Sequence, residues 1–512
     1  MHRQSALNPR TVLSVQQMRR ISALGIAFIT VALAGLFATS SPASSADVVV
    51  AVRADQELGP VRTHLATQFI WPGGLDRSAG SRARLSALAP PIIRINVTTD
   101  GYPGLPLVMP AGLAQGDWDF SNLDSMVGDA HDAGARVLIT IPYAPHWMWD
   151  CGTATLRDTT FAEFAAYAAR LVAYYNTGSF SAEDGRQILN PIGTAHRVTD
   201  WELWNEPDQR SSACPPSAGL TPEDYVRMWN ASADAMLAVD PAIKLVGPTT
   251  GAPVTGRSPD YLPALLAGAR HRPDVVSFHA YGGWQNAQTD RFIFDGDGMC
   301  CGLAGIDRGL AEVRAIAGDT PVWITELNVN SAWDGDDPAA RPWTAYGAAW
   351  GASAFARFAR AGVDTVYQFQ FAHPTLRQFS MLDAAGVPML PYWRDYYLAR
   401  YFPPGSVLLS ATSSLDEIET LAARPPGSAN VRVLVINRRV ESDTAVGGPG
   451  APATVQVTVS NLAPAMGVTL RLVDATTPLE NGPTLASLPG GDAASVSLPG
   501  YGFALLEFVV GP

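Results

Sequence analysis

Two glutamates, each following an apolar run, are the residues whose type and setting could do chemistry. Glu206 ends the segment Trp-Glu-Leu-Trp-Asn-Glu at 201–206, and Glu326 ends Val-Trp-Ile-Thr-Glu at 322–326. Both runs are typical of buried strands, so each strand would present a carboxylate at its far end. Two carboxyl groups about 5–5.5 Å apart can flank a glycosidic bond, one attacking the anomeric carbon while the other protonates the leaving oxygen. The pair therefore predicts retaining glycoside hydrolysis by double displacement through a glycosyl-enzyme intermediate.

The charge of one glutamate would influence the pKa of the other, and this would give the two carboxyl groups different roles. An ionised nucleophile raises the pKa of the neighbouring carboxyl, which then serves first as an acid and later as a base toward water. A single glutamate at a strand end is often only a helix cap or a member of an ion pair. Two of them, both on buried strands and both beside polar and aromatic residues, favour catalysis over that structural role.

An alternation of strands and helices must position these residues. From about residue 62 to 400, short apolar runs alternate with amphipathic stretches. Continuous apolar runs are typical of strands buried on both faces of a parallel sheet. We expect eight such strands, at Thr63–Ile70, Pro91–Val97, Arg136–Ile141, Val198–Trp204, Ile243–Gly247, Asp274–Phe278, Val322–Thr325 and Asp364–Phe369.

Helix start signals lie between the strands. Thr160 with Glu163 predicts a capping box, and Thr221 before Pro222 predicts a capped helix start. The pattern favours the α/β class and a (β/α)8 TIM barrel. An open doubly wound sheet is the rival, but no G-x-G-x-x-G follows the first strand. In a barrel the C-terminal strand ends carry the chemistry, so both glutamates would face one bowl.

The sequence changes character after residue 400. Short alternating runs, separated by Pro, Gly, Asn and Asp, predict an antiparallel β-sandwich over residues 401–512. Residues 47–61 contain a strand-like run, Asp47–Arg53, that has no place among the eight barrel strands. We expect it to join the sandwich, with residues 62–400 forming the catalytic barrel. At 512 residues the chain exceeds one ordinary core, which agrees with two folded units.

The N-terminus has the order of a secretory signal peptide, expected over residues 1–46. Arg19 and Arg20 precede an apolar run at 21–37, and small residues follow up to Ala46. The apolar run is long for a signal, so an uncleaved signal anchor is the alternative. We expect a secreted, extracytoplasmic protein whose mature form begins near Asp47, with no other transmembrane segment.

Export would allow the four cysteines to form disulfides. The expected bridge is Cys151–Cys214, because the two follow neighbouring strands of the predicted barrel. Cys300 and Cys301 are adjacent, so a bridge between them would be strained, and free or separately paired thiols are the alternative.

Composition excludes several partners. The net charge of −12 argues against nucleic acid, whose phosphates need clustered Lys and Arg. The Cys and His spacings fit no zinc pattern, so neither a metal nor a cofactor is expected. The expected partner is a carbohydrate substrate, and the oligomeric state is left open.

The motifs resemble those of a known group of enzymes. Trp-Asn-Glu-Pro at 204–207 and Ile-Thr-Glu-Leu-Asn at 324–328 are similar to clan A of the glycoside hydrolases. The longer Trp-Glu-Leu-Trp-Asn-Glu-Pro-Asp at 201–208 most resembles family 39, which includes β-xylosidases, α-L-iduronidases and exopolysaccharide hydrolases. Trp-Asp-Phe-Ser-Asn-Leu-Asp at 118–124 also resembles that family. The resemblance covers the barrel and, by architecture only, the C-terminal sandwich.

The resemblance implies roles for particular residues. Glu206 would be the acid/base and Glu326 the nucleophile. Asn205 would bind the sugar 2-hydroxyl, and Arg94 would hold Glu326 ionised, although a barrel-mouth salt bridge is the alternative. His279 and Tyr281 are similar to the clan's pocket residues, although each could also be an ordinary buried polar group.

Aromatic side chains near the strand ends are candidates for stacking on sugars. They are Tyr143, His146, Trp147, Trp284 and Trp333, with Trp147 and Trp284 chosen as substrate-binding residues. Many clan members have a Trp at the end of the eighth strand, where this chain reads Tyr-Gln-Phe-Gln-Phe-Ala-His at 367–373. This departure leaves the sugar undetermined.

Two other functions stay open at this point. One is an endo-glycanase or furanosidase of the same clan with the same catalytic residues. The other is a non-catalytic polysaccharide-binding protein on the same scaffold, although such a protein has no need of the two paired glutamates.

Overall fold

The computed structural model describes residues 47–69, 75, 78–97, 107–153, 155–209, 219–253, 260–296, 301–333, 335–373 and 375–511. The expected signal segment at 1–46 lies outside the described residues. Within the described ranges, no helix is both long enough and apolar enough to cross a membrane.

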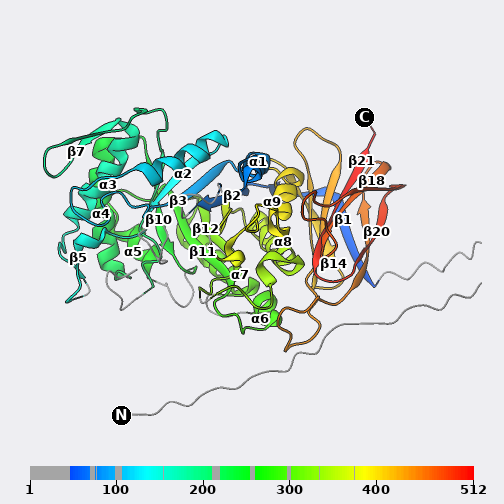
Figure 1. Cartoon of the computed structure of the whole chain (residues 1–512). Coiled ribbons are helices and arrows are strands. Elements are labelled where there is room, and N and C mark those ends of the chain that lie inside the picture. The colour runs from blue at the N-terminus through cyan, green and yellow to red at the C-terminus, as the bar shows by residue number, and fades with distance from the viewer. Residues whose placement is uncertain are drawn as a thin grey trace, which may run out of the picture. The chain divides into compact units, whose positions relative to one another are not determined.

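Eight parallel strands close into a barrel (Figure 1). Each strand pairs in parallel with its two neighbours, as in a TIM barrel. The strands are β2 (His64–Phe69), β3 (Ile92–Asn96), β4 (Arg136–Ile141), β9 (Asp200–Leu203), β10 (Lys244–Thr250), β11 (Val275–Gly283), β12 (Val322–Asn330) and β13 (Thr365–Gln368). The predicted barrel is confirmed, and each of the eight predicted runs overlaps one of these strands.

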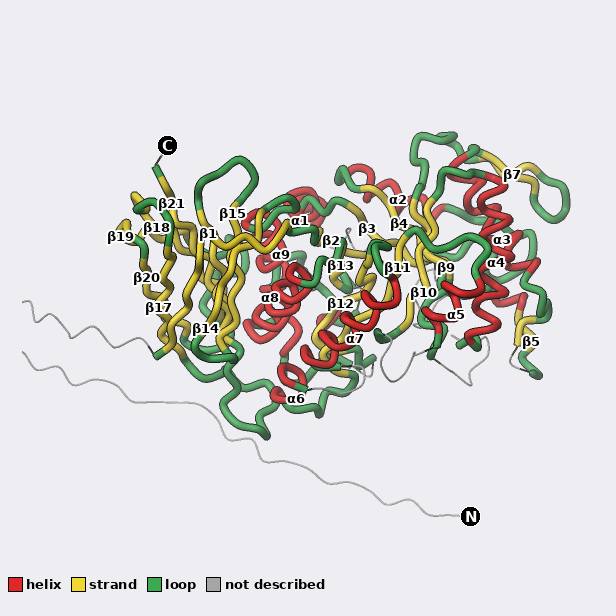
Figure 2. The backbone as a smooth tube through the Cα atoms, turned by 180° about the vertical axis from the view of Figure 1, so that it is seen from behind, coloured by secondary structure: helices red, strands yellow, loops and turns green. Residues whose placement is uncertain are grey.

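Helices surround the barrel, as the tube view shows (Figure 2). The α-helices are α1 (Ala79–Leu88), α2 (Ser121–Asp132), α3 (Ala162–Asn176), α4 (Pro222–Val239), α5 (Tyr261–Gly268), α6 (Asp290–Asp295), α7 (Leu303–Ala317), α8 (Ala345–Arg360) and α9 (Leu390–Tyr401). Short 3-10 turns lie at His146–Met148, Arg341–Trp343 and Arg377–Phe379, and small hairpins are formed by β5 (Trp149–Asp150) with β6 (Thr155–Leu156) and by β7 (Ser179–Ser181) with β8 (Gln187–Leu189).

The two predicted helix starts differ in outcome. At α4, the Thr221 hydroxyl accepts the Asp224 N–H at 3.1 Å, so this predicted cap is confirmed. The predicted capping box at Thr160 is wrong, because α3 begins later and Phe161 precedes it with φ 64°. The carboxylate of Asp158 accepts the Glu163 N–H at 2.9 Å, so an acidic side chain two residues earlier satisfies the helix start.

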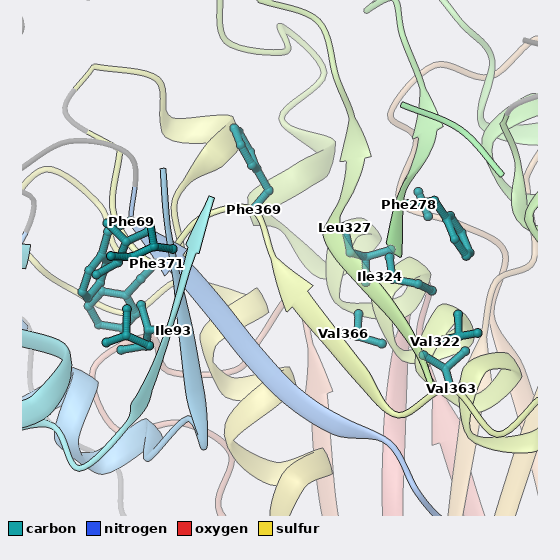
Figure 3. Close-up of a cluster of buried hydrophobic side chains, with 14 of the residues drawn as sticks. Phe69, Ile93, Phe278, Val322, Ile324, Leu327, Val363, Val366, Phe369 and Phe371 are labelled. Carbon is teal, nitrogen blue, oxygen red and sulfur yellow. The ribbon is translucent and has the colours of Figure 1, made fainter. Parts of the chain in front are cut away.

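Strand parity divides the barrel residues into two sets. Outward side chains pack under the helices, and Figure 3 shows several of them, with Phe69 lying beside Phe371 at 6.4 Å between ring centroids. A smaller inward cluster, which includes Leu138, Val246 and Tyr367, fills the barrel interior. This inward parity is what brings polar side chains together at the C-terminal strand ends.

The second domain is a nine-stranded sheet with its own core. Its order is β19 (Leu485–Gly491), β18 (Ala465–Asp474), β21 (Gly502–Val510), β16 (Val431–Asn437), β15 (Ile418–Arg424), β14 (Val407–Ser413), β1 (Val48–Pro60), β17 (Ala453–Ser460) and β20 (Ala493–Leu498). The barrel with a mostly antiparallel sandwich agrees with the expected fold. One pair departs from the antiparallel expectation, because β1 runs parallel to β17.

The first strand comes from the other end of the chain. β1 lies between β14 and β17, which places the run Asp47–Arg53 in the sheet to which the sequence assigned it. Its buried and exposed residues alternate from Val48 to Ala54, as in a strand with one face on a core. In β16, Val433 and Val435 enter the sandwich core, whereas Leu434 and Ile436 join the cluster under the barrel helices. Both faces of β16 are therefore covered.

Candidate active site

The Trp-Asn-Glu-Pro segment forms a sharp turn after β9. Trp204 has φ 71° and Glu206 has φ 45°, a left-handed conformation that is uncommon for residues other than glycine. The turn is fixed by two backbone bonds, from Trp204 N to Ile141 O at 2.9 Å and from Glu206 N to Thr249 O at 2.8 Å. Backbone strain of this kind persists where surrounding structure enforces it, and it is concentrated at functional sites. The turn directs Glu206 to the mouth of the barrel.

Glu326 is not at the end of its strand, which corrects the sequence interpretation. β12 was expected to stop at Thr325 but continues to Asn330, and β11 likewise runs past Phe278 to Gly283. The added residues pair with one another, His279 with Glu326 and Gly283 with Asn330, after a shift of register at Phe278. Such an irregularity re-aims the following side chains, and polar residues in this stretch gave no strand signal in the sequence.

Glu206, His279 and Glu326 meet at one point. One ligand-type atom from each of the three residues lies within 4.8 Å of the others. His279 Nδ1 is 2.8 Å from Glu206 Oε1 and 3.5 Å from Glu326 Oε2. Burial lowers the pKa of the His279 imidazole, with the Glu326 carboxylate opposing this effect. Because both neighbours of Nδ1 are carboxylate oxygens, we assign the imidazole proton to Nδ1.

Glu326 is held by two donors. Arg94 Nη1 donates to Oε1 at 2.7 Å, and the Tyr281 hydroxyl donates to Oε2 at 2.5 Å. Glu326 is only 5% exposed, so these bonds fix a carboxylate that solvent barely reaches. Burial, and then the Glu326 charge, raise the pKa of the Tyr281 phenol, which therefore stays a donor.

Arg94 organises the floor of the site. Besides Glu326, it donates to Glu202 Oε2 at 2.7 Å, Gln68 Oε1 at 2.8 Å and Asn205 Oδ1 at 2.8 Å, so four of its five N–H donors are used. Burial by itself would lower the pKa of Arg94, but the Glu202 and Glu326 carboxylates outweigh it and the pKa is raised.

Glu202 and Gln68 are site residues that the sequence reasoning missed. Glu202 is fully buried, and burial raises the pKa of its carboxyl, yet Arg94 and then His279 reverse the shift, so the pKa lies below its ordinary value of 4.5. Thr140 also donates to Glu202 Oε2 at 2.7 Å. Glu202 lies on β9, two residues after Asp200, so its side chain points into the barrel. A glutamate within an apolar strand was the only sign in the sequence that it has a role.

Asn205 has its amide oriented from two sides. Its Oδ1 accepts from Arg94, and the Tyr143 hydroxyl is hydrogen-bonded to the Asn205 side chain. Burial, and then the Glu206 charge, raise the pKa of Tyr143. Tyr143 was expected as a stacking surface, but this bond makes it a partner of the asparagine.

The predicted aromatic residues lie in different settings. Trp147 is half-buried, donates to Ala111 O at 2.6 Å and lies under the Arg157 guanidinium at 4.8 Å. Trp284 and Trp333 are 44% and 42% exposed. The Trp333 ring is 5.8 Å from that of Phe369, which is 6.2 Å from that of Tyr281, so these rings connect the rim to the nucleophile. His146 is half-buried at the start of the 3-10 turn before β5.

The cysteine expectation falls partly outside the described residues. Cys151 and Cys301 are both disulfide-bonded. Cys214 and Cys300 lie outside the described residues, so the expected Cys151–Cys214 pairing stays a prediction.

The site chemistry fits acid–base and nucleophilic catalysis by side chains. Glu206, His279 and Glu326 are also a donor set of the kind that divalent cations accept. However, both oxygens of Glu326 already accept short hydrogen bonds from Arg94 and Tyr281. These bonds favour a catalytic use of the carboxylate over ligation.

The sequence around both glutamates matches a known protein family. Residues 185–402, a span containing both glutamates, match the family model described as glycosyl hydrolases family 39. No curated protein matches the chain.

Solved structures share the fold at low sequence identity. A glucosidase from Croceicoccus marinus is 17% identical, with a TM-score of 0.62, 91% of this chain covered and 99% of that one. A GH39 enzyme from Xanthomonas axonopodis pv. citri is 15% identical, with a TM-score of 0.61 and coverages of 90% and 97%. A monomeric beta-xylosidase from Caulobacter crescentus CB15 is 15% identical, with a TM-score of 0.60 and coverages of 90% and 100%. Residues 185–402 are therefore similar to family 39 of the glycosyl hydrolases, and the fold is similar to that of solved enzymes, one of them a GH39 enzyme.

Proposed function

We propose that Glu206 is the acid/base and Glu326 the nucleophile in hydrolysis of O-glycosidic bonds in an oligo- or polysaccharide. The observation that carries this assignment is the approach of their side-chain oxygens to within 4.8 Å around His279. Retaining enzymes place the two carboxyl groups about 5–5.5 Å apart, whereas inverting enzymes separate them by about 6.5–9.5 Å.

The surroundings of the two glutamates support different roles. Glu326 is almost fully buried and held by Arg94 and Tyr281, as suits a nucleophile that must meet one carbon atom in one direction. The Glu206 side chain is 21% exposed, so it can exchange protons with a leaving group and with water.

The reaction then proceeds in two displacements. Glu326 attacks the anomeric carbon and forms an ester while the leaving oxygen takes the proton of Glu206. Water next attacks that carbon, gives its proton to Glu206 and releases Glu326. Asn205, oriented by Arg94 and Tyr143, is placed to donate its amide N–H to the sugar 2-hydroxyl.

Replacement of each carboxylate tests the roles. Glu206→Gln and Glu326→Gln should each lose most activity while circular dichroism stays unchanged, because glutamine has the same shape and Arg94 still pairs with Glu202 in the Glu326→Gln variant. With an activated aryl leaving group, Glu206→Gln should keep the faster glycosylation step, and azide should accelerate its turnover and give a glycosyl azide of retained configuration. Equal loss in both variants with no azide response would contradict the assignment.

We further propose a neutral pyranoside as the substrate. Structures with this fold include proteins named as a glucosidase and as beta-xylosidases. Arg94 has four of its N–H donors engaged and is fully buried, so it is unsuited to bind a uronic acid carboxylate. A panel of p-nitrophenyl glycosides should show the highest kcat/KM for a neutral pyranoside. A higher kcat/KM for a furanoside would contradict the pyranoside proposal. Binding of polysaccharide without any cleavage would indicate a non-catalytic binding protein.

We also propose that the protein is exported. The support is the positive, apolar and small-residue order at residues 19–46, together with disulfide-bonded Cys151 and Cys301. Expression in a secreting host and N-terminal sequencing should find a mature end near Asp47. Retention of the intact N-terminus in the membrane fraction would show an uncleaved anchor instead.

A further inference from the structure

The loop at 284–289 carries an exposed tryptophan at the catalytic end of the barrel. It follows Gly283, the last residue of the strand that contains His279 and Tyr281. Trp284 is 44% exposed, and its ring meets Phe292 edge-on at 5.4 Å. Gln288 Oε1 accepts the N–H groups of Trp284 at 2.7 Å and Gln285 at 3.0 Å, which folds the loop tightly. About three residues of strand, or about 10 Å, separate Trp284 from Tyr281 along the backbone.

A buried arginine holds this loop. Arg341 donates to the carbonyl of Gln288 at 2.6 Å and to that of Asn286 at 2.8 Å, and it is paired with Asp337 at 2.8 Å. The Asn286 side chain also accepts from Asn330 at 2.6 Å, and Asn330 ends the strand that carries Glu326. The loop is therefore fixed both to the nucleophile strand and to Arg341.

The sandwich supplies the next contact. Asp290, the first residue of α6, is fully buried and accepts the backbone N–H groups of Gly447 at 2.8 Å and Gly448 at 3.1 Å. Asp290 N donates in return to Ala445 O at 2.8 Å. These partners lie in the segment 445–448 between β16 and β17. Gly447 has φ +72°, and a Cβ there would lie 2.4 Å from the Cβ of Ala339, so this docking requires glycine.

The charges explain why the contact matters. Asp290, Asp337 and Arg341 are almost completely buried, with two negative charges against one positive charge. A buried carboxylate is stable only when donors surround it. Asp290 is 3.4 Å from Arg341 Nη1, and segment 445–448 provides two more donors. The sandwich thus completes the cluster that holds loop 284–289.

We propose that segment 445–448 of the sandwich, acting through Asp290 and Arg341, positions Trp284 to bind an outer sugar unit of an oligosaccharide substrate. This rests on the proposed glycosidase function and deepens it, because it makes the second domain part of substrate recognition. Asp290 and Arg341 are positioning residues, since they act through the loop and do not touch the sugar.

The test compares two substrates of the same sugar, a p-nitrophenyl monosaccharide and an oligosaccharide of at least four units. Asp290→Asn and Gly447→Ala should each lower the ratio of kcat/KM for the oligosaccharide to that for the aryl glycoside by about tenfold, mainly through KM, as expected for one aromatic contact. Trp284→Ala should give the same loss, and Asp290→Asn should add little to it in the double variant.

Arg291→Ala is the matched control. Arg291 is the next residue on α6 and also bonds to the sandwich, through Glu417 at 3.1 Å and Asp443 at 3.2 Å, but none of its ion-pair partners lies in loop 284–289. Arg291→Ala should leave the ratio of the two kcat/KM values within twofold of that of the unmodified protein. An equal fall in Arg291→Ala would overturn the proposal, as would an unchanged ratio in the folded Asp290→Asn protein.

Three outcomes can be told apart: a variant that does not fold, failure of the glycosidase function, and failure of the positioning proposal alone. If Asp290→Asn does not fold, Gly447→Ala decides, because it displaces the segment while keeping the buried charges. If the unmodified protein cleaves neither substrate, the glycosidase function has failed. If it cleaves both and Trp284→Ala leaves the ratio unchanged, only the positioning proposal has failed.

Discussion

Replacing Glu202 by Gln should destabilise the protein in a way that depends on pH. The carboxylate is fully buried and bonded to Arg94 and Thr140, both at 2.7 Å. Removing one partner of a buried ion pair costs about 3–5 kcal/mol, and we expect about 3 kcal/mol because Arg94 keeps Glu326. The pKa of Glu202 lies below its ordinary 4.5, so its stabilising contribution is present above about pH 4.5 and is lost as the pH falls through the folded value.

Urea unfolding at pH 7, 5.5 and 4 measures this difference. The stability gap between the unmodified protein and Glu202→Gln should stay constant from pH 7 to 5.5 and shrink at pH 4. Asp200→Asn is the matched control on the same strand. Asp200 is also buried, but its partner Arg136 is 55% exposed and stays hydrated when the carboxylate is removed, so no buried cation loses its partner. Its cost should be smaller, about 1–2 kcal/mol. A gap for Glu202→Gln below 1 kcal/mol, or one that is equal at all three pH values, would refute the reasoning.

Three further predictions concern the nucleophile, a helix and the second domain. Tyr281→Phe removes the 2.5 Å hydrogen bond to Glu326 and should lower kcat by about 10–100-fold with little change in unfolding, the loss expected for a bond to a charged group; an unchanged kcat would show that Arg94 alone positions the carboxylate. Thr221→Ala removes the cap of α4 and should cost about 1 kcal/mol in urea unfolding, whereas no loss would mean that water replaces the hydroxyl. Deleting residues 402–512 should cause aggregation or a much lower Tm, because β1 loses both neighbouring strands and the apolar side chains under α8 and α9 are uncovered; a soluble, active barrel would show independent domains.

The sequence was informative where hydrophobic pattern alone sets the structure. The eight barrel strands were predictable because they are buried on both faces, so their apolar runs are continuous. The ends of β11 and β12 were not, because the residues from His279 to Gly283 and from Glu326 to Asn330 form strand through pairing with each other. In the sandwich, the sequence of β19 carries little strand signal, because most of its residues are exposed and it ends in Pro-Gly-Gly.

The site was predictable in part for a similar reason. Glu206 and Glu326 stood out because a carboxylate after an apolar strand is unusual. Glu202 lies in the same stretch, but its role depends on its ion pair with Arg94, which points into the barrel from β3, the second strand away. Contacts between residues that are far apart in the sequence leave no local signal in a single sequence.

The Trp-Asn-Glu-Pro motif specifies a backbone turn as much as a set of catalytic groups. Trp204 at φ 71° anchors its ring in the core, where it is fully buried and 5.4 Å from Phe164. Asn205 then accepts from Arg94 inside the barrel, and Glu206 at φ 45° reaches His279 at the mouth of the barrel. Pro207 cannot donate a backbone N–H, so the strand cannot continue past the glutamate. The strained turn thus places two consecutive side chains on the same sugar-binding face, which an extended strand would direct to opposite sides.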